Sequence, residues 1–148
     1  MIVRRLRPGD EELAASVVNA VKPEEERGGN VADIALMKGF LANESNYLVV
    51  AYEDDIPMGF ALGYCLPRVD RYKNMMYLHE VGVAEAHQGK GVGKAIMNET
   101  VRICREEGYM EMFLITGKDN PPAVRLYTGT GGVPGDDEPV VFCWDFTA

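Results

Sequence analysis

The stretch most suggestive of chemistry is a set of alternating glycines, Gly89, Gly91 and Gly93, between an apolar segment and a long amphipathic one. This pattern predicts a strand, a glycine-rich corner and the start of a helix. The first amide groups of a helix lack intrahelical partners and carry partial positive charge. Glycines at such a place let a bulky anion approach the main chain. The corner therefore predicts a phosphate cradle.

Two familiar nucleotide motifs fit this corner poorly. A Walker A loop would end in Gly93-Lys94, but it requires a glycine where Gln88 stands and a serine or threonine where Ala95 stands. A Rossmann fingerprint would begin with Gly89-x-Gly91, but its third glycine is replaced by Lys94. Hydrolysis of ATP or GTP is thus disfavoured, and a nicotinamide-dependent oxidoreductase remains a weak alternative.

Length and charge narrow the class of protein. The chain has 148 residues, of which 47% are hydrophobic, so we expect residues 1–148 to form one domain with a sizeable core. The net charge of −8 argues against a nucleic-acid partner. An acidic surface would attract a cationic small molecule, although acidity alone also keeps a protein in solution.

The three cysteines, Cys65, Cys104 and Cys143, are widely separated and have no metal-ligand spacing. Such thiols are typical of a reducing compartment. The sequence has no hydrophobic signal core and no apolar run of membrane-spanning length. We therefore predict a cytoplasmic protein without a bound metal or a membrane partner.

Hydrophobic periodicity predicts an α+β (mixed α/β) fold, with helices flanking a central, mostly antiparallel sheet. Strands are expected at 2–6, 47–52, 58–66, 76–83, 110–116 and 140–146, with a loop or short strand at 133–138. Asp10, Asn30 and the glycine corner should begin three helices, and Pro121 and Pro122 fit the first turn of a fourth. The predicted element order is β-α-α-β-β-β-α-β-α-β-β.

A third pattern, Gln88-x-x-Gly91-x-Gly93 directly after a strand, has a richer context. Downstream, another predicted strand is followed by Asn120, Ala123, Leu126-Tyr127 and the glycines at 131–132. With both segments, the chain resembles the GNAT superfamily of acyl-CoA-dependent N-acetyltransferases.

The resemblance extends to the aminoglycoside 3-N-acetyltransferase branch of that superfamily. It is carried by Leu66-Pro67-Arg68, by Glu80-Val81-Gly82-Val83 and by the segment 122–128, and covers most of the chain from Tyr47 onward. The glycine-rich segment 131–137 is longer than in that branch, which leaves the identity of the acceptor open.

The resemblance implies a GNAT-like acyl-CoA N-acyltransferase fold and acetyl-CoA as cosubstrate. Main-chain amides of the corner would hold the pyrophosphate, with Lys90 and Lys94 adding positive charge. The backbone of Val81 and Val83 would run beside the pantetheine arm, with the Val81 N–H as the oxyanion donor. Asn120 would bind the pantetheine as well as cap a helix. The implied coenzyme-binding residues are Val81, Val83, Gln88, Gly89, Lys90, Gly91, Val92, Gly93, Lys94 and Asn120.

Glu80 is the candidate base, because a charged residue in an otherwise apolar strand needs a reason to be there. It could take the amine proton, directly or through water, or it could only bind a cationic substrate. Strand alternation predicts that His79 and Val81 share one face and that Glu80 and Gly82 share the other. His79 is the weaker base candidate. By resemblance, Tyr127 would protonate the departing thiolate.

The acceptor would be a small, cationic primary amine, and an aminoglycoside is one possibility. Carboxylates that bind and orient it could come from Asp70, Asp136, Asp137, Glu138 and Asp145. A second hypothesis keeps the acyl-CoA site without catalysis, as a sensor or partner module. A homodimer is also expected from the resemblance.

Overall fold

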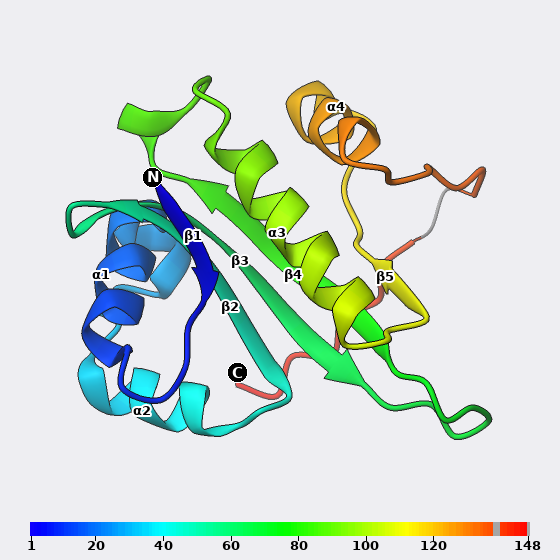
Figure 1. Cartoon of the computed structure of the whole chain (residues 1–148), viewed down its shortest axis with the longest axis horizontal. Coiled ribbons are helices and arrows are strands. Elements are labelled where there is room, and N and C mark those ends of the chain that lie inside the picture. Colours follow the sequence, from blue (N-terminus) through cyan, green and yellow to red (C-terminus); the bar gives the residue numbers. More distant parts are fainter. Residues whose placement is uncertain (138–139, 148) are drawn as a thin grey trace.

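The computed structural model describes residues 1–137 and 140–147. Its elements are β1 (Ile2–Arg5), α1 (Glu11–Val21), η1 (Glu24–Arg27), α2 (Ile34–Ala42), β2 (Asn46–Glu53), β3 (Ile56–Leu66), β4 (Met75–Val83), η2 (Glu85–His87), α3 (Val92–Glu106), β5 (Glu111–Phe113) and α4 (Pro121–Gly129). The strands form one sheet in the order β1-β2-β3-β4-β5 (Figure 1). Pairing is antiparallel up to β4, and β5 runs parallel to β4.

Local sequence explains the hairpin at the centre of the sheet. Asp54 and Asp55 lie between β2 and β3, and both have positive φ angles, 47° and 66°. Aspartate tolerates this left-handed conformation better than most residues, and tight hairpin turns require it. The turn therefore sets the register of β2 against β3.

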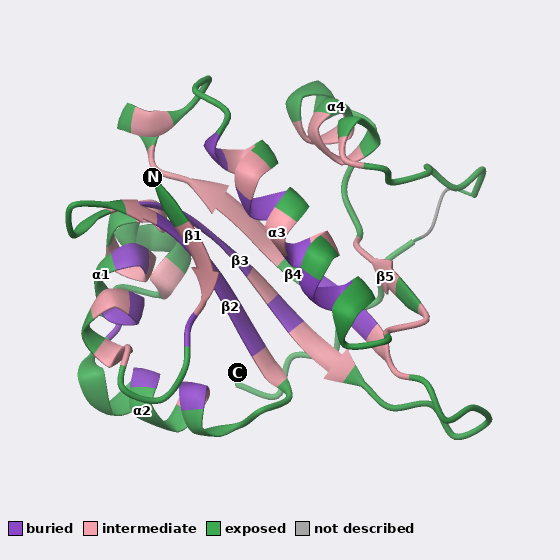
Figure 2. Cartoon of the chain, in the orientation of Figure 1, coloured by how far each residue is buried: buried purple, intermediate pink, exposed green. Residues whose placement is uncertain are grey.

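Helices cover both faces of the sheet. The side chains of α1 and α2 pack with Val50 and Phe60 in one core, and those of α3 pack with Val49 and Ala61 in a second core on the opposite face. The buried inner stripes of α1 and α3 are visible in Figure 2. Because β2 is covered on both sides, it reads as a continuous apolar run.

Two helix starts differ in detail from the sequence expectation. The second helix is capped by Asp33, whose carboxylate accepts the Leu36 N–H at 2.8 Å, so Asn30 is not its cap. Asp10 does precede α1, but its carboxylate is bound by the Arg4 guanidinium and by the Arg7 N–H instead of a helical amide. A neighbouring cation competes with the helix for the same oxygens.

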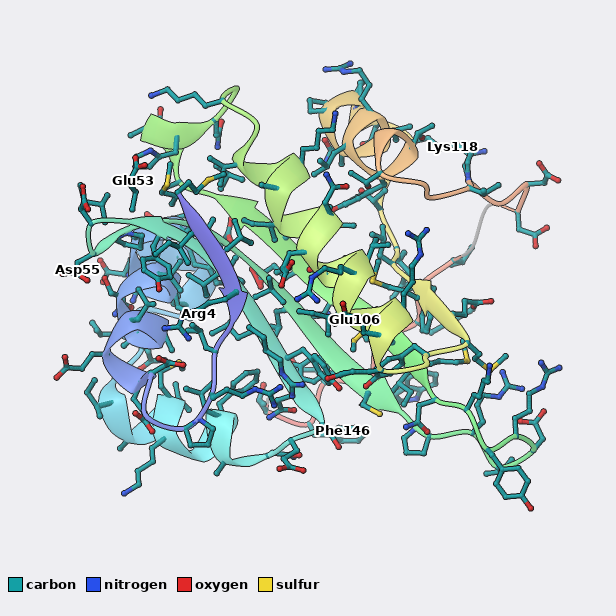
Figure 3. All side chains as sticks on the ribbon, viewed as in Figure 1. Arg4, Glu53, Asp55, Glu106, Lys118 and Phe146 are labelled. Carbon is teal, nitrogen blue, oxygen red and sulfur yellow. The ribbon has the colours of Figure 1, made fainter. Side chains whose placement is uncertain are left out.

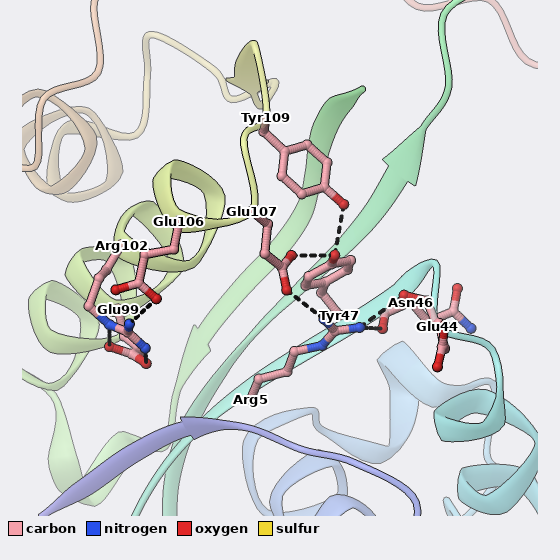
Figure 4. Close-up of polar contacts among 9 residues, drawn as sticks. All are labelled: Arg5, Glu44, Asn46, Tyr47, Glu99, Arg102, Glu106, Glu107 and Tyr109. Atoms are coloured by element: carbon pink, nitrogen blue, oxygen red, sulfur yellow. Dashed lines mark hydrogen bonds and ion pairs between the residues drawn. The ribbon is translucent and has the colours of Figure 1, made fainter. Parts of the chain in front are cut away.

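A polar network joins β1 to the end of α3 (Figure 4). The Arg5 guanidinium lies 3.4 Å from the centroid of the Tyr47 ring and donates to the Glu44 carbonyl at 2.9 Å. Arg5 also pairs with Glu107 at 3.3 Å, and the Tyr47 hydroxyl donates to the same carboxylate at 2.5 Å. The Tyr109 hydroxyl in turn donates to the Tyr47 oxygen at 2.8 Å. The network fixes the corner between α3 and β5 against the first strands.

The carboxyl-terminal part of the predicted order is wrong in two respects. β5 is shorter than the expected strand at 110–116, and no strand forms within 133–137 or 140–147. Val140, Phe142, Trp144 and Phe146 are exposed, and Phe146 is marked in Figure 3. Apolar alternation makes a strand only where a neighbouring edge takes up its hydrogen bonds. In the described part of the chain, no strand pairs with the outer edge of β5.

Candidate active site

The neighbouring strands β4 and β5 pair only over a short distance. Their parallel register ends at Tyr77 and Phe113, whereas β4 continues to Val83. Within the described residues, no strand lies against this side of β4 from Leu78 onward. In Figure 1, β4 runs on towards η2 while the chain after β5 turns away to α4. A free strand edge offers main-chain donors and acceptors to an extended ligand.

A β-bulge interrupts β4 beside this free edge. Leu62 pairs with Glu80 and Gly63 pairs with Leu78, so His79 is the extra residue. The bulge reverses the alternation, so the prediction that His79 and Val81 share a face is wrong. The His79 ring lies against Tyr64 and Tyr77, on the same side of the sheet as Glu80.

The predicted cradle follows η2 and leads into α3. Gly89 and Gly91 have φ angles of 72° and 81°, which glycine adopts without strain, and Gly91 is the N-cap residue of α3. The first helical hydrogen bond is donated by Ala95 to Gly91. The amides of 92–94 are therefore left for other partners, as at any helix start. A Cβ added at either glycine would meet no atom within 4 Å, so their surroundings are open.

Gly93 has a different role from the other two glycines. A Cβ at this position would lie 3.3 Å from Leu126 of α4 and 3.6 Å from Val83 of β4. The missing side chain therefore lets α3, α4 and β4 approach closely. Val92, beside it, is buried in the core on the α3 side.

Polar side chains of the loop contact its own main chain. Gln88 Nε2 donates to the Val83 carbonyl at 3.1 Å, and Lys90 Nζ donates to the Ala86 carbonyl at 3.1 Å. Lys94 is exposed on the first turn of α3. Two lysines and a helix start thus give local positive potential on a protein of net charge −8.

Glu80 has a partner that sequence reasoning missed. Lys22 Nζ lies 3.0 Å from Glu80 Oε1 and 3.1 Å from Oε2, and each side chain is about a quarter exposed. Lys22 ends α1, far from Glu80 in sequence, so no local pattern joins them. Burial, followed by the negative charge of Glu80, raises the pKa of the nearby Tyr64 hydroxyl.

A cavity of about 560 Å³ opens beside this ion pair, between the end of α1, η1 and the end of β4. Its walls include Lys22, Val83 and Gln88, and three carboxylates also line it, from Glu24, Glu26 and Glu85. The run of glutamates at 24–26 was the available signal in the sequence, but it is equally typical of a solvated loop. Carboxylates around a concave surface can bind a cation.

Tyr127 lies on α4 and packs against the core on the α3 side, which Val81, Val83 and Leu126 also border. Burial raises the pKa of its hydroxyl. Asn120 caps this helix, because its side-chain oxygen accepts the Ala123 N–H at 3.4 Å. The structure thus brings Tyr127 to the same side of the sheet as Val81 and Val83.

The five acids predicted for the acceptor are not gathered in one place. Asp70 lies on the β3–β4 loop, at the other end of β4 from the cradle, and pairs with Arg68 at 2.8 Å. Asp136 and Asp137 are exposed, and Asp145 accepts hydrogen bonds from Thr147. Glu138 falls outside the described residues. Across 1–137 and 140–147, no cluster of three or more histidine, cysteine or acidic side chains is suited to a metal, and no helix could cross a membrane.

The chain that forms this free strand edge, bulge and glycine-rich helix start matches a known protein family. Residues 14–131 match the acetyltransferase (GNAT) family model, and the chain belongs to that family. The resemblance seen in the sequence is thereby confirmed.

Curated relatives agree with this assignment. A mycothiol acetyltransferase of Renibacterium salmoninarum is 29% identical over 133 residues, which are 87% of this chain and 39% of that protein. N-acetyltransferase family 8 member 2 of Rattus norvegicus is 30% identical over 59 residues, 40% of this chain and 26% of that protein. The chain spans less than half the length of these relatives.

Solved structures share the fold over nearly the whole chain. An aminoglycoside acetyltransferase from an uncultured soil metagenomic sample, in complex with sisomicin, superposes with a TM-score of 0.84 at 21% identity, covering 99% of this chain and 96% of that one. A ribosomal-protein-alanine N-acetyltransferase from Brucella melitensis biovar Abortus 2308 gives 0.72 at 18% identity, with 97% and 98% covered. At these identities the likeness establishes the GNAT fold.

Proposed function

We propose that this protein is an N-acetyltransferase that moves acetyl directly from acetyl-CoA to the primary amine of a small cationic acceptor. The observation that carries the proposal is the free edge of β4 beyond Tyr77, which leads to the glycine-rich start of α3. An extended pantetheine arm fits beside such an edge, and a pyrophosphate suits the helix start.

The coenzyme supplies an activated acetyl thioester. In the proposal, the amides of 88–94 hold its pyrophosphate, and the main chain of Val81 and Val83 aligns its arm. The Val81 N–H donates to the oxygen on which negative charge develops. Asn120 contacts the arm from the start of α4.

Direct transfer requires a neutral amine and a protonated leaving group. Glu80 is the proposed recipient of the amine proton, and its partner Lys22 lines the neighbouring cavity. Tyr127 is the proposed acid, since a tyrosine hydroxyl carries its proton at neutral pH; burial raises its pKa further. Lys22 must move away from Glu80, or be replaced by the incoming ammonium, before the carboxylate can take a proton from the acceptor.

The acceptor class follows from charge. Glu24, Glu26 and Glu85 line the same cavity as Lys22, the partner of Glu80, so a molecule with several ammonium groups suits it. An aminoglycoside is the finer form of this proposal, supported by the structural neighbour solved with sisomicin. Asp70, Asp136, Asp137, Glu138 and Asp145 remain acceptor candidates from sequence.

The test joins calorimetry with thiol release. Acetyl-CoA is titrated into the protein, and a panel of amines that includes sisomicin is then screened for free thiol. Binding with acceptor-dependent release supports the enzyme, whereas binding without any release supports the sensor module. If acetyl-CoA does not bind and a calorimetric titration with NAD shows binding, the oxidoreductase hypothesis is supported.

Assembly is a separate part of the proposal. The apolar residues Val140, Phe142 and Trp144 are 74–76% exposed, and the outer edge of β5 has no partner among the described strands. Exposed apolar groups and open strand edges favour association. A homodimer is therefore expected, and sedimentation equilibrium tests it: a monomer mass at all concentrations would contradict it.

A further inference from the structure

Hydrogen bonds made by its main-chain N–H and carbonyl hold Lys22 in place. Its N–H donates to the Val18 carbonyl, and its carbonyl accepts from Arg27 Nε at 3.0 Å. From this fixed point its side chain reaches β4 and places an ammonium group on both oxygens of Glu80. The amine of Lys22 therefore already lies against the carboxylate that accepts the amine proton in the proposed reaction.

The same amine shares a cavity with the proposed coenzyme site. Lys22 lines the cavity together with Val83 and Gln88, the residue at the end of β4 and the residue that begins the cradle. Two other lysines are placed differently: Lys90 lies in the coenzyme loop but donates to the Ala86 carbonyl, and Lys38 is exposed on α2. Lys22 thus combines proximity to the carboxylate with proximity to the coenzyme loop.

We propose that Lys22 is acetylated by the protein's own active site. This inference rests on the proposed function. A proton passes from Lys22 Nζ to Glu80, and the neutral Nζ forms a bond to the acetyl carbon of acetyl-CoA. The carbon–sulfur bond breaks, and the thiolate leaves as coenzyme A with a proton from Tyr127. Nζ loses its remaining extra proton to water, Tyr127 regains a proton from water, and Glu80 releases its proton to solvent. The products are Nε-acetyl-Lys22 and coenzyme A, with no redox change.

Acetylation changes the site as well as the lysine. The amide product is neutral and cannot form an ion pair, so Glu80 loses its counter-ion. The carboxylate then becomes available to a cationic acceptor without competition from Lys22. The first turnover of the protein on itself would prepare the site for later turnovers.

The experiment incubates the full chain with acetyl-CoA and no added amine, and peptide mass spectrometry follows acetyl at each lysine over time. Lys22 should be modified about 100-fold faster than the exposed Lys38, a factor that general-base catalysis supplies. The first-order rate constant should not change on dilution, since donor site and acceptor belong to one chain. A rate that scales with protein concentration would overturn the proposal.

Three variants separate the possible outcomes. Glu80→Gln should slow Lys22 acetylation about 100-fold, while Glu12→Gln, at an exposed position of α1 away from this cavity, should leave its rate unchanged. Lys22→Arg keeps a cation for Glu80 and should remove the modification entirely. Binding of acetyl-CoA with Lys22 acetylated no faster than Lys38 refutes this inference alone, whereas no binding at all refutes the proposed function.

Discussion

Gln88 donates from Nε2 to the carbonyl oxygen of Val83 at 3.1 Å, across the turn between β4 and α3. One side chain thereby ties the proposed pyrophosphate loop to the strand proposed to guide the pantetheine arm. The contact makes the loop and the strand a single unit whose two ends must keep their spacing.

Replacement of Gln88 tests this coupling. Gln88→Leu removes the donor, and Gln88→Glu also adds a negative charge beside the proposed pyrophosphate site. We expect the affinity for coenzyme A to fall about 10-fold in the glutamate variant, equivalent to about 1.4 kcal/mol, and less in the leucine variant. Titration calorimetry gives both values. Equal affinity for coenzyme A in the wild type and both variants would show that the pyrophosphate does not bind at this loop.

The two ends of α3 provide a matched pair of glycines. Gly91 and Gly108 have φ angles of 81° and 76°, and neither has an atom within 4 Å of an added Cβ. Gly91→Leu and Gly108→Leu should each lower the free energy of unfolding by about 1–2 kcal/mol, because L-residues are strained in this region. Only Gly91→Leu should also weaken coenzyme A binding. Equal binding by the two variants would show that Gly91 serves the helix and not the ligand.

Tyr127→Phe removes the proposed acid while keeping the ring in its packing. We expect turnover to fall about 100-fold, with little change in the dissociation constant of coenzyme A. Burial raises the pKa of Tyr127, so its proton is retained as pH rises to about 10, the ordinary value for tyrosine. The ratio of wild-type to variant turnover should therefore stay constant from pH 7 to 9. An equal turnover in both proteins would remove Tyr127 from the mechanism.

The Arg5 network predicts unequal effects for two arginines. Arg5→Met leaves Glu107 and two main-chain carbonyls without their arginine partner. The Arg5 side chain is only 8% exposed, so this loss occurs in a largely buried region. We expect a loss of about 2 kcal/mol in the free energy of unfolding. Arg102 pairs with Glu99 and Glu106 at the surface, so Arg102→Met should cost about 0.5 kcal/mol. Urea denaturation of both variants makes the comparison.

The sequence allowed prediction of features that depend on local chemistry. The glycine corner, the hairpin turn at Asp54 and the proline-started α4 each need particular residues at particular positions. Lys22 could not be paired with Glu80 in this way, because their contact depends on how α1 crosses β4. The bulge at His79 was likewise hidden, since it is a property of pairing between β3 and β4. The segment 140–146 has the apolar alternation expected of a strand, but it does not pair with any strand of the described chain.

Asp10 gives the clearest pH-dependent prediction. The Arg4 guanidinium binds both of its oxygens at 2.9 Å, and this contact holds the pKa of the Asp10 carboxyl below its usual value. A lowered folded-state pKa stabilises the protein above the unfolded value of about 3.9, and this contribution is lost as pH falls through the folded value.

Asp10→Asn should lower the free energy of unfolding by about 1 kcal/mol at pH 7, since the pair is partly exposed. Asparagine can still accept the Arg7 N–H, so the variant isolates the charge. In urea denaturation at pH 7, 5 and 3, the difference from wild type should persist at pH 5 and begin to shrink below about pH 4. A difference that stays the same at all three values would show that Arg4 does not act through the ionised carboxylate.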